Sequence, residues 1–294
     1  MNPVQKRRGI RVSLGEQIMR YRLFAAAVAC LVTIVILAVH AWSQSHTPRE
    51  APKDVRSRLL KQVLADDSDV RDCIAEDANG VRTAAENMSA EAVDLNRDGV
   101  AEYEVQLSGP CACGNVNCTI YLYKQTTTGY ELILEGASGF GLDLLKTASN
   151  GYQDVQVTAH DNAATQSRTT YKFDGKQYRE AKSLLVEAQT GESKPAYRRV
   201  QFQRGTSSTT LQGKVSIALP DTYLVGARAG QVMTIQLTAP RQSIKFMVMA
   251  SRTTTMLADN TRSWTGTLPE TGDYHIIVEG DEKGGSYSMT VSIK

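Results

Sequence analysis

The sequence lacks the strings that mark common enzyme active sites. It contains no GxSxG, HExxH or P-loop pattern, and only three histidines lie beyond residue 42. His160 and Asp161 form the one adjacent His/Asp pair, and no nucleophile can be named to act with them. Because no set of nucleophile, base and orienting group can be assembled, we expect a protein that is not an enzyme.

An excess of one charge is also missing. The chain has 33 basic and 31 acidic residues, a net charge of +2, and much of that excess lies in residues 1–22. No basic stripe is left to attract nucleic acid, so we expect no nucleic-acid partner. Aromatic residues make up only 6% of the chain, and most of them are tyrosines, which are common in antiparallel sheets.

The chain does contain one long apolar run, residues 23–42, with the sequence LFAAAVACLVTIVILAVHAW. Its length matches the ~20 residues that a helix needs to cross a bilayer. The basic segment 1–22 precedes it, and Lys and Arg stay on the cytoplasmic side of a membrane. We therefore predict a single-pass signal anchor in the inner membrane, with the rest of the chain in the periplasm or outside. A signal peptide cleaved after Ala41 is the alternative.

The pattern beyond the apolar run predicts a mainly β protein with one short helical segment. Residues 43–54 contain two prolines and mixed charge, which is typical of a linker. Apolar residues at three- and four-residue spacing predict a helix over 54–77. Alternating segments within 92–182 predict strands, and Asp174-Gly175 predicts a hairpin. We assign the helix and these strands to one domain, residues 55–182.

A second domain is expected after a polar linker at residues 183–197. Residues 198–294 contain short alternating segments with turns every 8–12 residues, which predicts an antiparallel β-sandwich. No segment there has helical periodicity. Ile244, Phe246 and Val248 alternate along one of these segments, and we expect them at the centre of the sandwich core.

The stretch DLNRDGVAE, which begins at Asp94, has the spacing of a calcium loop. Asp94, Asn96 and Asp98 occupy its first, third and fifth positions, and Glu102 occupies its ninth. Such oxygen ligands can converge on one hard cation, so we predict a calcium site, weak because the twelfth position, Val105, is not acidic. A turn stabilised by Asp and Asn side chains, without metal, is the alternative.

Four cysteines follow the apolar run, an even number that predicts disulfides in an oxidising compartment. We expect one bridge within the loop, either Cys113–Cys118 or Cys111–Cys118, and one bridge from Cys73 to the sheet. A bond between Cys111 and Cys113 would strain the ring. Zinc held by four thiolates is the alternative, although the CxC spacing is tighter than the usual CxxC.

Three segments of the last third carry recognisable motifs: VQFQRGTSS, DTYLVGARAGQ and LPETGDY. Their motif residues are Val200, Phe202, Arg204, Gly205, Ser207, Ser208, Tyr223, Ala227, Gly230, Gln231, Leu268, Pro269, Gly272 and Tyr274. These motifs resemble those of the bacterial inhibitors of goose-type lysozyme, and the segment also resembles pre-peptidase C-terminal domains. The middle part resembles uncharacterised exported domains with a DxNxDGxxE loop and a cysteine-rich turn.

The resemblance implies a periplasmic sandwich that inserts loops into a lysozyme cleft. Such a cleft is acidic, so basic or hydroxyl-bearing loop tips would suit it. The family often has a long Arg-rich loop between its last two strands, whereas this chain has the short, acidic EGDEKGGS, in which Lys283 is the one basic residue. We take Lys283 as the candidate partner-binding residue, with lysozyme or another envelope protein or glycan as the partner. The alternative function is an envelope scaffold or a carbohydrate- or protein-binding module without inhibitory activity.

Overall fold

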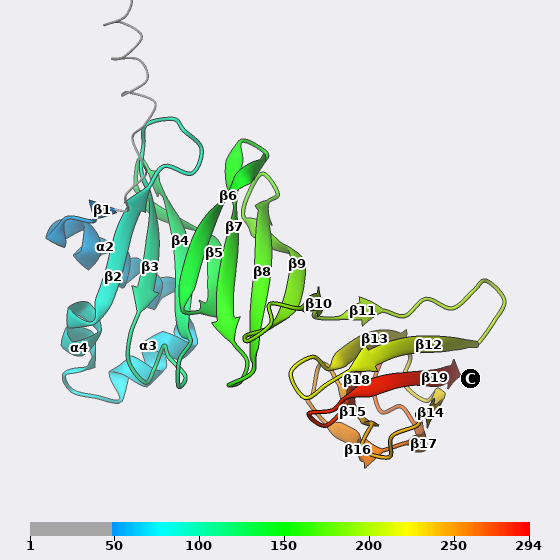
Figure 1. Ribbon diagram of the computed structural model, residues 1–294. Coiled ribbons are helices and arrows are strands. Elements are labelled where there is room, and N and C mark those ends of the chain that lie inside the picture. The colour runs from blue at the N-terminus through cyan, green and yellow to red at the C-terminus, as the bar shows by residue number, and fades with distance from the viewer. Residues whose placement is uncertain (1–48) are drawn as a thin grey trace, which may run out of the picture. The chain divides into compact units, whose positions relative to one another are not determined.

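The computed structural model describes residues 49–294 (Figure 1). The cytoplasmic segment 1–22, the signal anchor 23–42 and the first part of the linker 43–54 lie outside the described residues. Strands account for 54% and helices for 12% of what is described, in agreement with a mainly β protein. Within residues 49–294, no helix combines the length and the apolar character needed to cross a membrane.

The helical segment consists of three short helices, α2 (Lys53–Asp66), α3 (Ser68–Ala75) and α4 (Gly80–Glu86). The single helix that we predicted is interrupted at Asp67, whose backbone is extended. The Asp67 carboxylate accepts a hydrogen bond from the Val70 N–H at 2.9 Å and so caps α3. Helix α4 begins at Gly80, beyond residue 77, where we expected the helical segment to end, which corrects that prediction.

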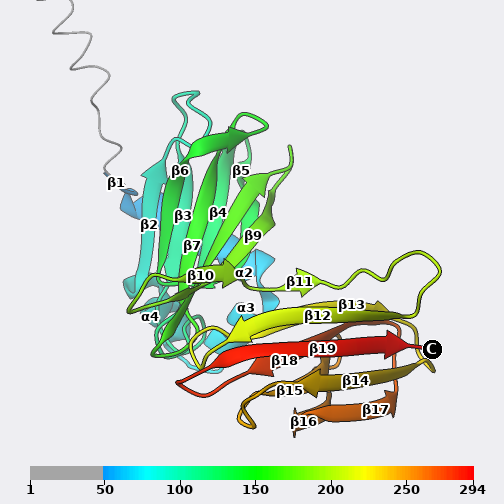
Figure 2. The same ribbon diagram turned by 45° about the vertical axis from the view of Figure 1, so that its right-hand side comes forward.

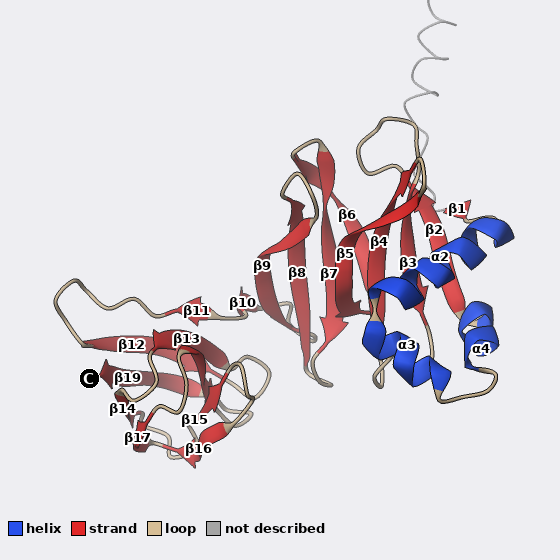
Figure 3. Cartoon of the chain, turned by 180° about the vertical axis from the view of Figure 1, so that it is seen from behind, coloured by secondary structure: helices blue, strands red, loops and turns tan. Residues whose placement is uncertain are grey.

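The helices cover one face of a five-stranded antiparallel sheet (Figure 3). In spatial order its strands are β1 (Arg49–Glu50), β2 (Met88–Val93), β3 (Glu102–Leu107), β4 (Cys118–Thr126) and β5 (Gly129–Gly139). Every second residue of these strands points towards the helices. Val105, Tyr121 and Tyr123 are fully buried there against Leu59 and Val63 of α2, and this burial holds the helices on the sheet.

The other face of that sheet packs against a second antiparallel sheet. Its strands, in spatial order, are β10 (Ser193–Pro195), β9 (Tyr178–Glu187), β8 (Thr165–Phe173), β7 (Tyr152–His160) and β6 (Gly141–Ser149). The core between the sheets includes Leu122, Val155 and Phe173. The hairpin at Asp174-Gly175 joins β8 to β9, as predicted. The end of β9 and all of β10 fall within residues 183–197, so the segment that we predicted as a linker is partly strand.

The last third is a sandwich of two sheets (Figure 2). One sheet has the order β11 (Arg198–Arg199), β13 (Asp221–Ala227), β18 (Gly272–Glu279), β15 (Lys245–Ala250) and β16 (Met256–Thr261). The other has the order β12 (Ser208–Val215), β19 (Gly285–Ile293), β14 (Val232–Thr238) and β17 (Ser263–Thr267). Ile244, Phe246 and Val248 are at most 1% exposed in the core between them, which confirms their predicted position.

Candidate functional site

Four connections of the sandwich lie at the same end, where β11, β13, β15 and β17 end and β12, β14, β16 and β18 begin. They are residues 200–207, 228–231, 251–255 and 268–271, and we call their common surface the motif end. The register supports this grouping: the last residue of β13 lies opposite the first of β18, and the first of β14 lies opposite the last of β17. Motif residues that are far apart in the sequence therefore meet on one surface.

Two of these turns are joined by backbone hydrogen bonds. The Leu268 N–H donates to the Gln231 carbonyl at 2.8 Å, and the Gly230 N–H donates to the Leu268 carbonyl at 2.9 Å. The Gln231 side chain closes its own turn by accepting from the Arg228 N–H at 2.8 Å. Gly230 has a φ of 83°, a left-handed value that glycine adopts without strain. These motif residues thus shape the backbone of the motif end.

The side chain of Tyr274 holds the LPETG turn in place from the core of the sandwich. Its side chain is fully buried, and its hydroxyl donates to the Glu270 carbonyl at 2.5 Å and accepts from the Glu270 N–H at 3.1 Å. A turn whose backbone is held on both sides by a core residue loses little conformational freedom on binding.

The segment between β11 and β12 belongs to the same end. It extends away from β11 and returns into β12 beside the C-terminus (Figures 1 and 2). The Ile293 N–H donates to the Ser207 carbonyl at 2.8 Å. Val232 and Lys294 exchange backbone hydrogen bonds at 2.9 and 3.0 Å, which ties this segment through β19 to the 228–231 turn.

The motif end carries exposed basic and hydroxyl-bearing side chains. Its exposed residues include Arg204, Arg228, Arg252, Thr206, Ser207, Thr253, Thr254 and Thr271. One carboxylate beside it, that of Asp273, is occupied by Arg199 in a bidentate pair at 2.7 and 2.8 Å. Hydrogen bonds from the guanidinium hold the pKa of Asp273 below its ordinary value. Arg204, Arg228 and Arg252 outnumber the one carboxylate within the motif end, that of the half-buried Glu270, so the surface has a positive character that suits a negatively charged partner.

Lys283 lies at the opposite end of the sandwich, in the turn between β18 and β19. The Asp281 carboxylate accepts from the N–H groups of Lys283 and Gly284 at 3.1 and 3.0 Å. The backbone carbonyl of Asp281 accepts from the Ile217 N–H at 3.1 Å, so this turn packs beside the β12–β13 connection. Lys283 is exposed, but the structure does not bring it together with the motif residues.

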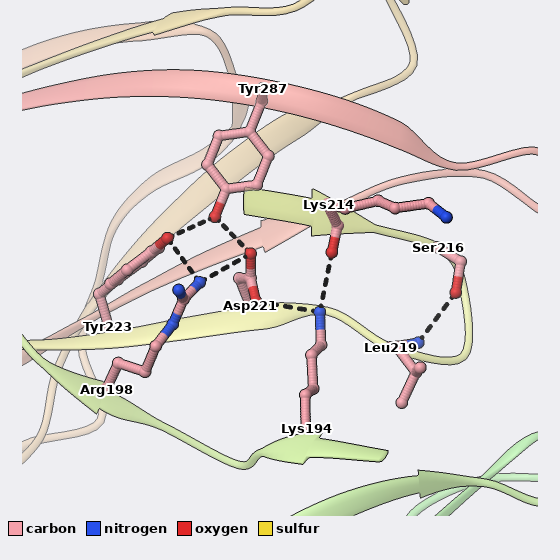
Figure 4. A network of polar contacts seen from close by, with 8 residues as sticks. All are labelled: Lys194, Arg198, Lys214, Ser216, Leu219, Asp221, Tyr223 and Tyr287. Atoms are coloured by element: carbon pink, nitrogen blue, oxygen red, sulfur yellow. Dashed lines mark hydrogen bonds and ion pairs between the residues drawn. The ribbon is translucent and has the colours of Figure 1, made fainter. Parts of the chain in front are cut away.

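A buried polar network joins the sandwich to β10 (Figure 4). The Asp221 carboxylate, 4% exposed, contacts Lys194 at 3.0 Å, Arg198 at 2.9 Å and the Tyr287 hydroxyl at 2.6 Å. The hydroxyls of Tyr287 and the motif residue Tyr223 lie 2.7 Å apart. Burial lowers the pKa of Lys194 while the neighbouring carboxylate favours its charged form. Tyr223 is therefore part of a structural network rather than of the exposed surface.

The calcium-type loop has its side chains turned towards its own backbone. Asp94 accepts from two backbone N–H groups at 2.6 and 3.1 Å, Asn96 from one at 3.0 Å and Asp98 from one at 2.7 Å. Glu102 accepts from the Leu95 N–H at 2.7 Å, and burial, with the two aspartates, raises its pKa to about 7. Among residues 49–294, no three His, Cys, Asp or Glu side chains are grouped to hold a metal ion. Calcium binding here stays a prediction.

The cysteines form two disulfides. Cys73 of α3 is bonded to Cys111, with the Cα atoms 5.6 Å apart, and Cys113 is bonded to Cys118 at the start of β4. The loop bridge is Cys113–Cys118, one of the two alternatives that we gave, and the bridge from Cys73 reaches the connection between β3 and β4 rather than a strand of the sheet. All four thiols are used in this pairing, which leaves none of them to ligate zinc.

No protein-family model and no curated protein matches the chain. Among solved structures, a periplasmic inhibitor of g-type lysozyme (PliG) from Aeromonas hydrophila is 29% identical, with a TM-score of 0.30, over 33% of this chain and 94% of the inhibitor. A pre-peptidase C-terminal domain of collagenase from Bacillus anthracis is 16% identical, with a TM-score of 0.24, over 33% and 94%. An exo-β-1,3-galactanase from Phanerochaete chrysosporium is 12% identical, with a TM-score of 0.21, over 70% and 78%.

Proposed function

We propose that this chain is a non-enzymatic envelope protein whose motif end enters the cleft of a goose-type lysozyme and blocks it. One observation carries the proposal: three motifs that resemble those of the inhibitor family converge on one surface, which exposes Arg204, Arg228 and Arg252. Lysozyme clefts carry catalytic carboxylates. Guanidinium groups pair with carboxylates through two parallel hydrogen bonds, which gives both attraction and orientation.

The turns of the motif end also suit insertion into a cleft. Backbone hydrogen bonds join the 228–231 and 268–271 turns, and the buried Tyr274 holds the second of them. Binding would therefore cost these loops little conformational entropy, and more of the contact free energy would appear as affinity.

The proposed location follows from the N-terminal sequence. The apolar run 23–42 would serve as a signal anchor, and the basic segment 1–22 would remain in the cytoplasm. Residues 49–294 would then act in the periplasm, an oxidising compartment where disulfides such as Cys73–Cys111 persist.

The test uses residues 49–294, which form one compact unit with its own hydrophobic cores and both disulfides. We expect it to bind goose-type lysozyme and to stop lysis. Replacing Arg204, Arg228 and Arg252 together by Ala should weaken binding on the order of 100-fold, since each lost charge contact costs about 1 kcal/mol.

Two control variants make the result specific. Replacing Lys172, Lys176 and Lys182 by Ala removes the same charge from exposed positions on β8, β9 and their turn, and binding should not change. Lys283→Ala should also bind normally. A loss confined to Lys283→Ala would place the contact at the opposite end, and unimpaired lysis by goose-type lysozyme would overturn the proposal. Binding without inhibition would favour the scaffold alternative.

A further inference from the structure

A hollow of ≈ 500 Å³ lies in the middle part of the chain, where the cysteine-bridged loop meets the β7–β8 turn. Its polar lining is formed by Asn115, Asn117, Ser138, His160, Asp161 and Asn162. Sites for small molecules have volumes in the range of about 300–1,000 Å³. This hollow therefore has the size of a ligand site, and the proposed lysozyme contact does not use it.

The walls of the hollow are fixed before any ligand arrives. The Cys113–Cys118 disulfide closes the loop, and the Gly114 N–H donates to the Asn117 carbonyl at 2.8 Å. The Asn117 amide donates to the His160 carbonyl at 2.8 Å and accepts from the His160 N–H at 2.9 Å. One side chain thus joins the cysteine loop to the end of β7, and a ligand would meet a preorganised site.

Two large apolar side chains are exposed here: Val116, which lines the hollow, and Phe140, which does not line it but stacks on the lining residue His160. Phe140 is 43% exposed, and its ring stacks on the His160 ring with centroids 4.4 Å apart and planes at 22°. Val116, in the wall of the hollow, is 56% exposed. Large apolar side chains exposed around one concave site are a sign of binding. Here they offer a flat aromatic surface and an aliphatic contact.

The charge of the lining narrows the class of ligand. Asp161 is the one lining residue that is formally charged near neutral pH, and no Lys or Arg lines the hollow. An anionic ligand such as a phosphate would find no cation and would meet a carboxylate. The amides of Asn115 and Asn162 can each donate and accept hydrogen bonds. A neutral ligand with many hydroxyl or amide groups and an apolar face fits this set.

We propose that the hollow binds a neutral oligosaccharide. The C–H face of one sugar ring would stack on Phe140, while Asn115 and Asn162 would bond its hydroxyl or acetamido groups. Val116 would contact an acetamido methyl group where the sugar carries one. The proposal concerns the middle part of the chain and stands apart from the lysozyme contact at the motif end.

The test is a titration of isotope-labelled residues 49–294 with N-acetylchitotetraose and, separately, with cellotetraose, followed by NMR. We expect saturable shifts at Asn115, Phe140 and His160, with little change at Arg228 or Arg252. A stronger response to N-acetylchitotetraose would identify acetamido recognition, and equal responses would identify the sugar ring as the common ligand. The absence of saturable shifts with both sugars at millimolar concentration overturns the proposal.

Variants test whether the hollow is the site. Phe140→Ala and Asn115→Ala should each weaken binding by roughly threefold to tenfold, because each removes one stacking or hydrogen-bond contact. Tyr197→Ala removes an aromatic ring of similar exposure, 45% against 43%, from outside the hollow and should bind normally. Unchanged binding by both Phe140→Ala and Asn115→Ala, with their thermal unfolding intact, would also overturn the proposal. Inhibition of lysozyme acting on a small soluble substrate, measured on the same variants, should not change, which separates a failure of this proposal from a failure of the lysozyme proposal.

Discussion

Asp221 should be among the most sensitive polar positions in the described part of the chain. Its carboxylate contacts two cations and the Tyr287 hydroxyl, and its side chain is only 5% exposed. Asp221→Asn keeps the shape and one oxygen acceptor but removes the negative charge. The variant therefore tests the charge of the network rather than its packing.

The expected cost comes mainly from Lys194. Its side chain is 17% exposed, whereas that of Arg198 is 42% exposed and can be screened by water. Leaving a buried charge without its partner costs about 3–5 kcal/mol. Since the amide still accepts one hydrogen bond, we take the lower end, about 3 kcal/mol. For a unit of this size that lowers Tm by about 6–12 °C.

The cost should also depend on pH. Burial already lowers the pKa of Lys194, and removal of the Asp221 charge lowers it further. The folded variant then binds fewer protons than the unfolded chain, so its stability rises with pH until the unfolded lysine also loses its proton. The deficit relative to the original protein should therefore shrink as the pH rises towards the ordinary pKa of lysine.

Thermal and urea unfolding of residues 49–294 measure this effect. The matched control is Asp273→Asn, which breaks the exposed ion pair with Arg199. The Arg199 side chain is 52% exposed and the Asp273 side chain is 36% exposed. A surface pair contributes little, so the control should lose much less stability than Asp221→Asn. Equal losses in the two variants, or a deficit at Asp221 that does not change with pH, would refute the assignment of the cost to buried Lys194.

Two further predictions concern the disulfides and the acidic loop. Replacing Cys73 and Cys111 by Ser opens a loop with a sequence separation of 38 and should cost about 4 kcal/mol, whereas the Cys113/Cys118 double variant, with a separation of 5, should cost about 2 kcal/mol in urea unfolding. For the predicted calcium site, millimolar CaCl₂ should raise Tm, and Asp98→Asn should abolish the rise while keeping the turn. No rise in Tm would identify the loop as a turn held by its own side chains.

Local patterns predicted the strands and the core better than they predicted the helices. Alternation identified Ile244, Phe246 and Val248 as core, because burial on one face of a strand depends directly on this period. The break at Asp67 and the seven-residue helix α4 had no comparable signal. Helices this short gain their stability from tertiary packing, which a single sequence does not display.

The candidate site was only partly visible in the sequence. Arg204 lies within a motif and Arg228 lies two residues before the Gly230-Gln231 step, but Arg252 belongs to no motif. It joins the surface because β15 ends beside the start of β18, where a Cβ on Gly272 would lie 3.5 Å from Arg252 Cδ. Which turns meet on one surface depends on the order of the strands, and a single sequence does not display that order. The sequence therefore pointed to Lys283, through the EGDEKGGS loop, and not to Arg252.

The oligosaccharide site and the lysozyme contact that we propose would reinforce each other. A module that binds oligosaccharide through the hollow near Phe140 would keep the motif end close to glycan, which is also the substrate of a lysozyme. Once the hollow has bound glycan, the motif end lies close to any lysozyme that acts on the same glycan. The effective concentration of the motif end for that lysozyme can then reach the millimolar range without any new contact. Inhibition on insoluble cell wall should therefore fall more in Phe140→Ala than inhibition on a small soluble substrate. Equal inhibition of both substrates by Phe140→Ala would mean that the two sites act independently.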